Sequence, residues 1–187
     1  MTQVSTNELR VGMKVELDRE PYLVLANEFV KPGKGQAFNR IKLKNMMTGR
    51  VVERTIKSGD KLDLADVEET EVRFLYKDAD GAVFMDEKTF DQITINKDLL
   101  GDKEQWLKEE ILYHVIFYKG SPIELIPPTF MEMTIVETAP GLRGDTSGRV
   151  LKPAITDTGA KVQVPIFIEE GEKIKIDTRT CEYVSRI

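Results

Sequence analysis

The chain has 187 residues, 41% of them hydrophobic and 32% charged, and a formal net charge of −5. Its length allows one domain or up to three small ones. The acidic balance excludes a protein that coats nucleic acid indiscriminately, because neutralising many phosphates requires a broad positive surface. One cysteine and one histidine exclude an internal disulfide and a Cys/His metal cluster.

Residues 1–64 consist of short strand-like runs separated by turns, which is typical of a small β-barrel. Two arms, 22–30 and 38–44, enclose the turn-forming segment Lys31–Gln36 and predict a long β-hairpin. In the second arm, the apolar residues Phe38, Ile41 and Leu43 alternate with the polar residues Asn39, Arg40, Lys42 and Lys44. Proline presets φ at the turn entry, and glycines on either side of Lys34 permit positive φ. We therefore expect Lys34 to be presented at the tip. The alternative is a solvated turn whose charges serve only solubility.

Basic residues are concentrated near this hairpin. Residues 1–64 contain 12 basic and 8 acidic side chains, residues 65–128 contain 7 and 15, and residues 129–187 contain 8 and 9. The hairpin end is therefore the candidate polyanion-contacting surface, and the acidic middle segment is expected to face solvent. The basic residues between positions 28 and 54 are Lys31, Lys34, Arg40, Lys42, Lys44, Arg50 and Arg54.

The second segment, residues 65–128, opens with a hairpin signal, because Asp80-Gly81 between two strand-like runs tolerates positive φ. A short helix is predicted at Asp102–Lys108, where good helix formers follow Gly101. The segment ends at Pro127-Pro128, which indicates a domain boundary. The strands expected here cover residues 71–76, 82–85, 113–118 and 123–126.

The third segment, residues 129–187, also consists of strand-like runs, with a loop at 142–149. Many short strands with turns about every ten residues favour barrels over a parallel sheet. We therefore predict an all-β protein of three consecutive small β-barrels, bounded at 1–64, 65–128 and 129–187. The strands expected in the third barrel cover residues 131–137, 160–168, 173–177 and 182–185.

The sequence offers no catalytic constellation. His114 is the only imidazole and lies in an apolar strand, so we expect a partly buried residue bonded to the backbone, not a general base. Gly33-Lys34-Gly35 is not a phosphate-binding loop, since a strand and not a helix follows it. Cys181, in a strand-like run, is expected to be a passive packing residue. A pair of catalytic carboxylates stays open among the many acidic residues, although none has a distinctive spacing. We predict no metal and no cofactor.

Targeting signals are also missing. The apolar stretches are short and the N-terminus lacks the charged and apolar regions of a signal peptide, so we expect a cytoplasmic protein that does not contact membranes. Arg143-Gly144-Asp145 spells a cell-adhesion tripeptide, which we interpret as a chance match. Its place in a loop still makes it a candidate contact.

Three stretches resemble bacterial elongation factor P. Residues 28–38 resemble its modified-lysine hairpin, and residues 141–146 resemble the contact loop of its third domain. The longest, from Lys152 to Arg186, follows the C-terminal signature of the family in order. Lys34 places the chain with the factor proper and not with a paralogue that lacks this lysine.

The resemblance implies an SH3-like (KOW-like) N-terminal domain and two OB-fold domains in an L-shaped, tRNA-like arrangement. It also implies a non-enzymatic monomer that binds the 70S ribosome and its ribosomal RNA between the peptidyl and exit tRNA sites. In the family, the hairpin reaches along the acceptor arm of the peptidyl-tRNA. Peptide-bond formation is thereby stimulated, and stalling at consecutive prolines is relieved.

The resemblance also assigns functional residues. Lys34 is implied to carry a β-lysyl group, often followed by hydroxylation, which lysine-modifying enzymes add. The other residues of the hairpin tip are Lys31, Pro32, Gly33, Gly35 and Gln36. The implied contacts with the exit-site mRNA codon and the tRNA anticodon stem are Arg143, Gly144, Asp145 and Thr146, together with Tyr183 and Arg186.

Two other classes of protein remain as alternatives. A free-standing OB-fold RNA-binding module or RNA chaperone would use aromatic stacking platforms, and the acidic second segment and low aromatic content count against it. An enzyme that uses Lys34 as a Schiff-base amine would need a desolvated pocket around the lysine, whereas glycines flank it here.

Overall fold

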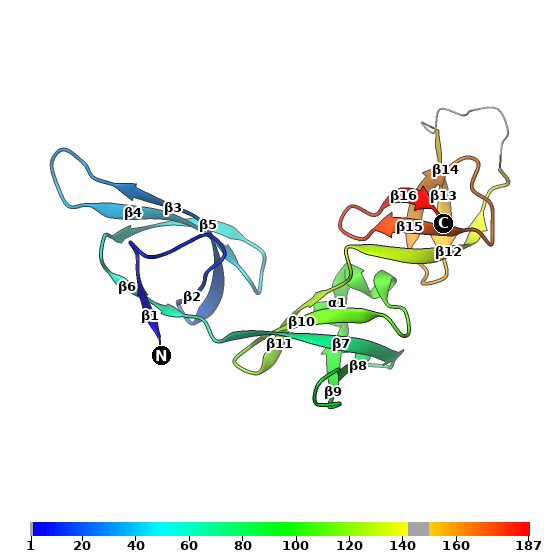
Figure 1. Cartoon of the computed structure of the whole chain (residues 1–187), viewed down its shortest axis with the longest axis horizontal. Coiled ribbons are helices and arrows are strands. Elements are labelled where there is room, and N and C mark those ends of the chain that lie inside the picture. The colour runs from blue at the N-terminus through cyan, green and yellow to red at the C-terminus, as the bar shows by residue number, and fades with distance from the viewer. Residues whose placement is uncertain (1, 142–149) are drawn as a thin grey trace. The chain divides into compact units, whose positions relative to one another are not determined.

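The computed structural model describes residues 2–141 and 150–187 and consists mainly of β-strands. The strands form three sheets that follow one another along the chain (Figure 1). The predicted all-β architecture with three consecutive β domains is confirmed. None of the helices in the described residues has the length and apolar character needed to cross a membrane.

The first sheet has the strand order β1-β6-β2-β3-β4-β5 and is antiparallel at each of its pairings. Alternation along β4 turns Ile41 and Leu43 into a core that also contains Val15 and Val24, all four fully buried. The strands are β1 (Gln3–Ser5), β2 (Lys14–Leu17), β3 (Glu20–Val30), β4 (Phe38–Asn45), β5 (Val51–Lys57) and β6 (Lys61–Leu64).

The second sheet has the order β11-β10-β7-β8-β9. At the first hairpin of this sheet, Gly81 was expected to adopt a positive φ, but it does not. Glycine is required there because a Cβ atom would lie 2.0 Å from the carbonyl oxygen of Ile95 on the neighbouring strand. The strands are β7 (Val67–Lys77), β8 (Gly81–Asp86), β9 (Gln92–Asn96), β10 (Leu112–Tyr118) and β11 (Ser121–Ile126).

The helix predicted at Asp102–Lys108 begins earlier and changes type. The α-helix α1 (Lys97–Leu100) is capped by Asn96, whose Oδ1 accepts a hydrogen bond of 2.9 Å from the Leu99 N–H. Gly101 has a φ of 51°, which ends the α-helical geometry, and the chain continues as the 3₁₀ helix η1 (Gly101–Trp106). The predicted helix thus matches η1 to within two residues at each end, whereas α1 was not predicted.

The third sheet closes into a barrel with the order β12-β13-β14-β16-β15. Its core is formed mainly by inward-facing aliphatic residues, such as Met133, Ile135 and Ile174, and Trp106 from η1 packs into the same cluster. β14 is shorter than predicted, because the chain turns after Pro165, where Ile168 N–H donates to the Pro165 carbonyl. The strands are β12 (Phe130–Thr138), β13 (Leu151–Thr156), β14 (Lys161–Pro165), β15 (Lys173–Asp177) and β16 (Glu182–Arg186).

The chain divides into two compact units. One contains the residues up to Thr70 together with Val115–Glu124, and the other contains Glu71–His114 together with Leu125–Ile187. The turn between β10 and β11 thus belongs to the same unit as the first sheet. His114 is half-buried in β10, as predicted.

Candidate functional site

The loop that carries Lys34 lies beyond the paired part of its hairpin. The last residue pair between β3 and β4 is Val30 with Phe38, so the chain from Lys31 to Ala37 forms a loop at one end of the first sheet (Figure 1). Lys34 is exposed, and no ion pair of its ammonium group exists within the described residues.

The other tip residues also face solvent. Lys31, Gly33, Gly35 and Gln36 are exposed, and Pro32 is half-buried. Only one of the two glycines beside Lys34 uses its conformational freedom: Gly35 has a φ of 110°. A Cβ atom at Gly33 would meet open space. The tip therefore presents an exposed lysine among residues that are mostly exposed as well.

A network of side-chain amides, one of them buried, holds the base of this hairpin. Asn27 on β3 donates from Nδ2 to the carbonyl oxygens of Thr6, at 2.8 Å, and Leu9, at 3.1 Å. Asn39 on β4 donates from Nδ2 to Asn27 Oδ1 at 3.0 Å and is only 2% exposed. Within the described residues, Asn39 Oδ1 has no hydrogen-bond partner. The hairpin is thus fastened to the N-terminal segment well before its tip.

Sequence reasoning missed this network, because it placed Asn39 among the solvent-facing positions. The signal was the alternation of β4 itself, since Asn39 shares the inward parity of Ile41, Leu43 and Asn45, and all four are buried. Phe38, which was expected on the inward face, has the opposite parity. A polar residue at an inward position predicts a hydrogen-bonded network.

The basic surface near the hairpin is partly neutralised. Arg40 lies 3.6 Å from Glu28 on one neighbouring strand and 3.6 Å from Glu53 on the other. Lys42 and Lys44 are exposed on the same face of β4 and are not part of these ion pairs. Among the described residues, the predicted basic end therefore keeps exposed charges outside these ion pairs, including those of Lys42, Lys44 and the loop lysines.

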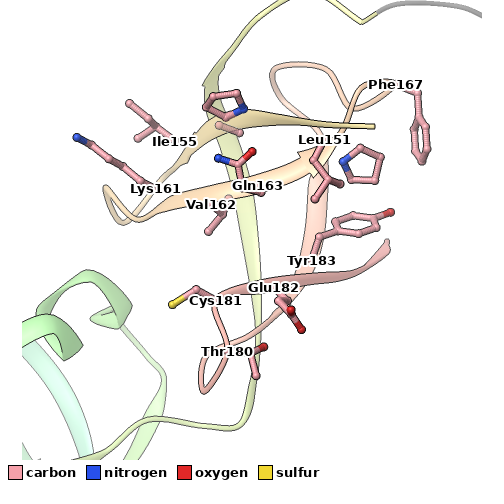
Figure 2. A pocket seen from close by; sticks show the side chains of 13 residues that line it. Leu151, Ile155, Lys161, Val162, Gln163, Phe167, Thr180, Cys181, Glu182 and Tyr183 are labelled. Atoms are coloured by element: carbon pink, nitrogen blue, oxygen red, sulfur yellow. The ribbon is translucent and has the colours of Figure 1, made fainter. Parts of the chain in front are cut away.

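Tyr183 lines an apolar groove of about 960 Å³ on the closed barrel. The groove runs over β13, β14 and the start of β16, with Tyr183, Leu151 and Phe167 toward one end and Thr180 and Cys181 toward the other (Figure 2). Burial raises the pKa of the Tyr183 phenol, and the backbone N–H of Arg186 opposes that shift. Tyr183 and Arg186 are thus neighbours in the structure, and their shared role stays a prediction.

The guanidinium of Arg186 is already engaged. It forms an ion pair with Glu172, while the Arg186 side chain remains 58% exposed. A phosphate that approached it would therefore compete with a carboxylate. The predicted contacts Arg143, Gly144, Asp145 and Thr146 lie outside the described residues.

Cys181 is not the packing residue that its sequence context suggested. It lies in the turn between β15 and β16, is exposed, and has a φ of 60°. Partial desolvation and the charges of Asp102 and Asp177 raise the pKa of its thiol, which is the wrong direction for a nucleophile. In the part of the chain that the structure describes, His, Cys, Asp and Glu side chains form no group of three that could hold a metal ion.

Three family models together match most of the chain. Residues 5–62 match the elongation factor P (EF-P) KOW-like domain, and residues 67–125 match the elongation factor P (EF-P) OB domain. Residues 131–186 match the model named elongation factor P, C-terminal. Each match coincides with one of the three sheets.

Curated relatives are similar over their full length. The protein named elongation factor P 2 from Protochlamydia amoebophila (strain UWE25) is 64% identical to this chain. The protein of the same name from Chlamydia caviae is 61% identical to it. Each alignment covers 100% of this chain and 99% of the relative.

Solved structures share the fold over two thirds of the chain. A structure named eukaryotic translation initiation factor 5A, from Methanococcus jannaschii, has a TM-score of 0.50 and 22% identity, and covers 67% of this chain and 96% of its own. A translation initiation factor eif-5a family protein from Naegleria fowleri has a TM-score of 0.53 and 16% identity, with coverages of 67% and 97%. At these identities the likeness concerns the fold alone.

Proposed function

Because the chain belongs to the elongation factor P family, we propose that it works through Lys34, which reaches toward the 3′ end of the peptidyl-tRNA on the ribosome. The family consists of non-enzymatic factors of translation elongation, so the ribosome and tRNA are its partners. The factor binds as a monomer between the peptidyl and exit tRNA sites of cytoplasmic ribosomes. It contacts ribosomal RNA there and relieves stalling at consecutive prolines.

The observation that carries this proposal is the exposed position of Lys34 on a loop beyond the last pair of β3 and β4. The fixed base supports it, because the amide network and the buried Ile41 hold both strands while Lys34 stays exposed. An arm of about eight residues at roughly 3.3 Å each carries a side chain about 25 Å from the base. A β-lysyl group on Lys34, with or without hydroxylation, extends that reach and keeps the positive charge.

Lys34 acts by positioning, not by proton transfer. We suggest that the modified side chain holds the CCA end of the peptidyl-tRNA by hydrogen bonds and charge. This contact restores the geometry that is productive for attack and that proline disfavours. Orientation of reactants lowers a barrier by several kcal/mol without any catalytic side chain. The exposed Lys42 and Lys44 are suited to contact the phosphates of the acceptor arm.

The C-terminal barrel carries the second proposed contact. Tyr183 and Arg186 lie together on β16 and are suited to an RNA backbone, because a phenol stacks or donates a hydrogen bond and a guanidinium pairs with phosphate. Arg143, Gly144, Asp145 and Thr146 are proposed to approach the exit-site codon. We also propose domain boundaries near residues 64 and 128, which the breaks between β6 and β7 and between β11 and β12 support.

The decisive experiment compares Lys34→Ala with Lys31→Ala in reconstituted translation of a proline run, after mass spectrometry has identified the group on Lys34. We expect Lys34→Ala to slow peptide-bond formation roughly tenfold or more. Its free energy of unfolding should remain within about 0.5 kcal/mol of the parent value. Lys31→Ala removes a second exposed charge from the same loop and should keep most of the rate. Equal activity of Lys34→Ala and the modified parent would contradict the proposal.

A further inference from the structure

Two hairpin turns far apart in the sequence are joined by side chains. Glu16 on β2 accepts a hydrogen bond of 2.6 Å from the Tyr118 hydroxyl at the end of β10. The Lys119 ammonium lies 3.0 Å from the same carboxylate oxygen, Oε2. The backbone contributes too, because the Lys119 N–H donates to the Asp66 carbonyl at 3.1 Å and the Tyr118 hydroxyl lies 3.3 Å from the Arg19 carbonyl. The first sheet is thereby fastened to the β10–β11 turn of the same compact unit.

Both turns have an unusual backbone for their sequences. Lys119 and Gly120 have φ values of 49° and 79°, and Asp18 and Arg19, between β2 and β3, have values of 53° and 64°. Two consecutive residues with positive φ characterise the tightest hairpin turns, in which Asn-Gly is favoured. Lysine and arginine adopt this backbone at a cost. The Lys119 side chain is therefore better explained by its contact with Glu16 than by the requirements of the turn.

The shared carboxylate is well suited to hold two donors. The Glu16 side chain is only 15% exposed, and the hydrogen bond from Tyr118 and the charge of Lys119 hold its pKa below the ordinary value. The Lys119 ammonium also lies 5.1 Å from the centre of the Tyr118 ring. All three side chains thus restrain one another, which favours a single geometry over a loose surface ion pair.

We propose that Glu16, Tyr118 and Lys119 form a positioning clamp, which holds the first sheet against the β10–β11 turn and so fixes the direction in which Lys34 is presented. The connection is short, because Glu16 pairs with Pro21 at the start of β3, and β3 continues to Val30, next to the Lys34 loop. Its register against β4 shifts once on the way, between Val24 and Ala26. The clamp residues are positioning residues and do not contact the tRNA. Their effect on translation rests on the proposed function of Lys34, whereas the geometry of the clamp can be measured without it.

The geometry is tested by a distance between two spin labels in the full-length chain. The labels are placed at Thr55→Cys on β5 and Ser121→Cys on β11, both exposed, in a Cys181→Ser background. With the clamp intact we expect a single narrow distance distribution. Glu16→Gln keeps an acceptor but removes the charge, and should broaden the distribution. An equally narrow distribution in Glu16→Gln would overturn the proposal.

Lys119→Asn separates positioning from simple stability. It creates the Asn-Gly turn that this backbone favours, so the protein should unfold at the same or a higher denaturant concentration. If Lys119 positions the hairpin, the maximal rate on a proline run at saturating factor should still fall about threefold, the size expected for one partly exposed ion pair. A stable variant with an unchanged maximal rate would overturn the proposal.

Charge reversal provides the rescue control. Glu16→Lys alone should lower the maximal rate and broaden the label distances, and adding Lys119→Glu should restore much of both. Failure of the pair to restore either would count against a direct contact. Lys34→Ala distinguishes the two proposals, since it should abolish stimulation and leave the label distances narrow. If Lys34→Ala stays active, the proposed function fails, and the distances still decide whether the clamp exists.

Discussion

The hairpins β3–β4 and β10–β11 both place a lysine in the connection between two antiparallel strands, but they use it differently. Lys34 stands on a seven-residue exposed loop, from Lys31 to Ala37, and its ammonium forms no ion pair within the described residues. Lys119 occupies a tight turn, and its ammonium is bound to Glu16. A charge meant for a partner must stay unpaired, whereas a charge that shapes the molecule is already paired.

In the β3–β4 hairpin, the residues that stabilise the fold and the residue proposed to act on the tRNA lie at opposite ends. Its base contains the buried Ile41 and the amides of Asn27 and Asn39, while its tip contains small and charged residues that face solvent. Substitutions at the base should therefore change the free energy of unfolding, and substitutions at the tip should change function alone. Measuring both quantities on the same variants tests this separation.

The largest effect on stability is expected for Ile41→Ala. Ile41 is fully buried in the core of the first sheet, so its truncation loses apolar burial and leaves a cavity, at a cost of about 3 kcal/mol. Urea unfolding monitored by circular dichroism measures this change, with Lys34→Ala as the matched control on the same hairpin. A loss below about 1 kcal/mol would mean that the hairpin base does not anchor the sheet.

A smaller loss is expected for Asn39→Ala. This substitution removes the hydrogen bond to Asn27 Oδ1 but also removes the buried Oδ1 atom that has no partner among the described residues, so the two effects partly cancel. We expect a cost of about 1 kcal/mol in the same urea experiment. Thr55→Ala, at an exposed position of the neighbouring strand, is the control and should change little. A stabilised Asn39→Ala variant would show that the missing partner outweighs the network.

Local pattern in the sequence was enough to predict most of the strands, the three-sheet architecture and the exposed Lys34 loop, but it missed β1, β6, β9 and β13. Alternation, turn residues and the flanking glycines act over a few residues, and the structure agrees with them there. The burial of Asn39 was also encoded locally, because Asn39 occupies an inward position in the alternation of β4. It was missed because the polar character of the side chain was considered and its position in the alternation was not.

Features that depend on distant residues could not be predicted in this way. Glu16 and Tyr118 are 102 residues apart in the sequence, and no local pattern indicates that one carboxylate receives a phenol and an ammonium. Gly81 shows the same limit, because its need for glycine comes from a neighbouring strand and not from its own turn. Cys181 was misjudged because it lies in the turn between β15 and β16, with a φ of 60°, and not in a strand.

The smallest effect is the pH dependence of the contact at Lys119, and its sign follows from the pKa shifts. The hydrogen bond from Tyr118 and the nearby Lys119 lower the pKa of Glu16 in the folded protein below its ordinary value of 4.5. The stabilisation is therefore complete above about pH 4.5 and is lost as the pH falls through the folded pKa. The pKa of Lys119 is raised above 10.5, chiefly by its contact with Glu16, so its share is complete below that pH and is lost as the pH rises through the folded pKa.

Glu16→Gln removes both contributions, so the difference in Tm between the parent and this variant should form a plateau at neutral pH and shrink toward pH 3. Thermal unfolding at a series of pH values measures this difference. Glu28→Gln is the matched control, because it removes an exposed carboxylate 3.6 Å from Arg40 on the free hairpin and should give a small difference at neutral pH. Equal pH profiles for the two variants would mean that charge stabilises the contact of Glu16 with the β10–β11 turn no more than it stabilises the contact of Glu28 with Arg40 on the β3–β4 hairpin. The contrast between Lys34 and Lys119 would then rest on exposure alone.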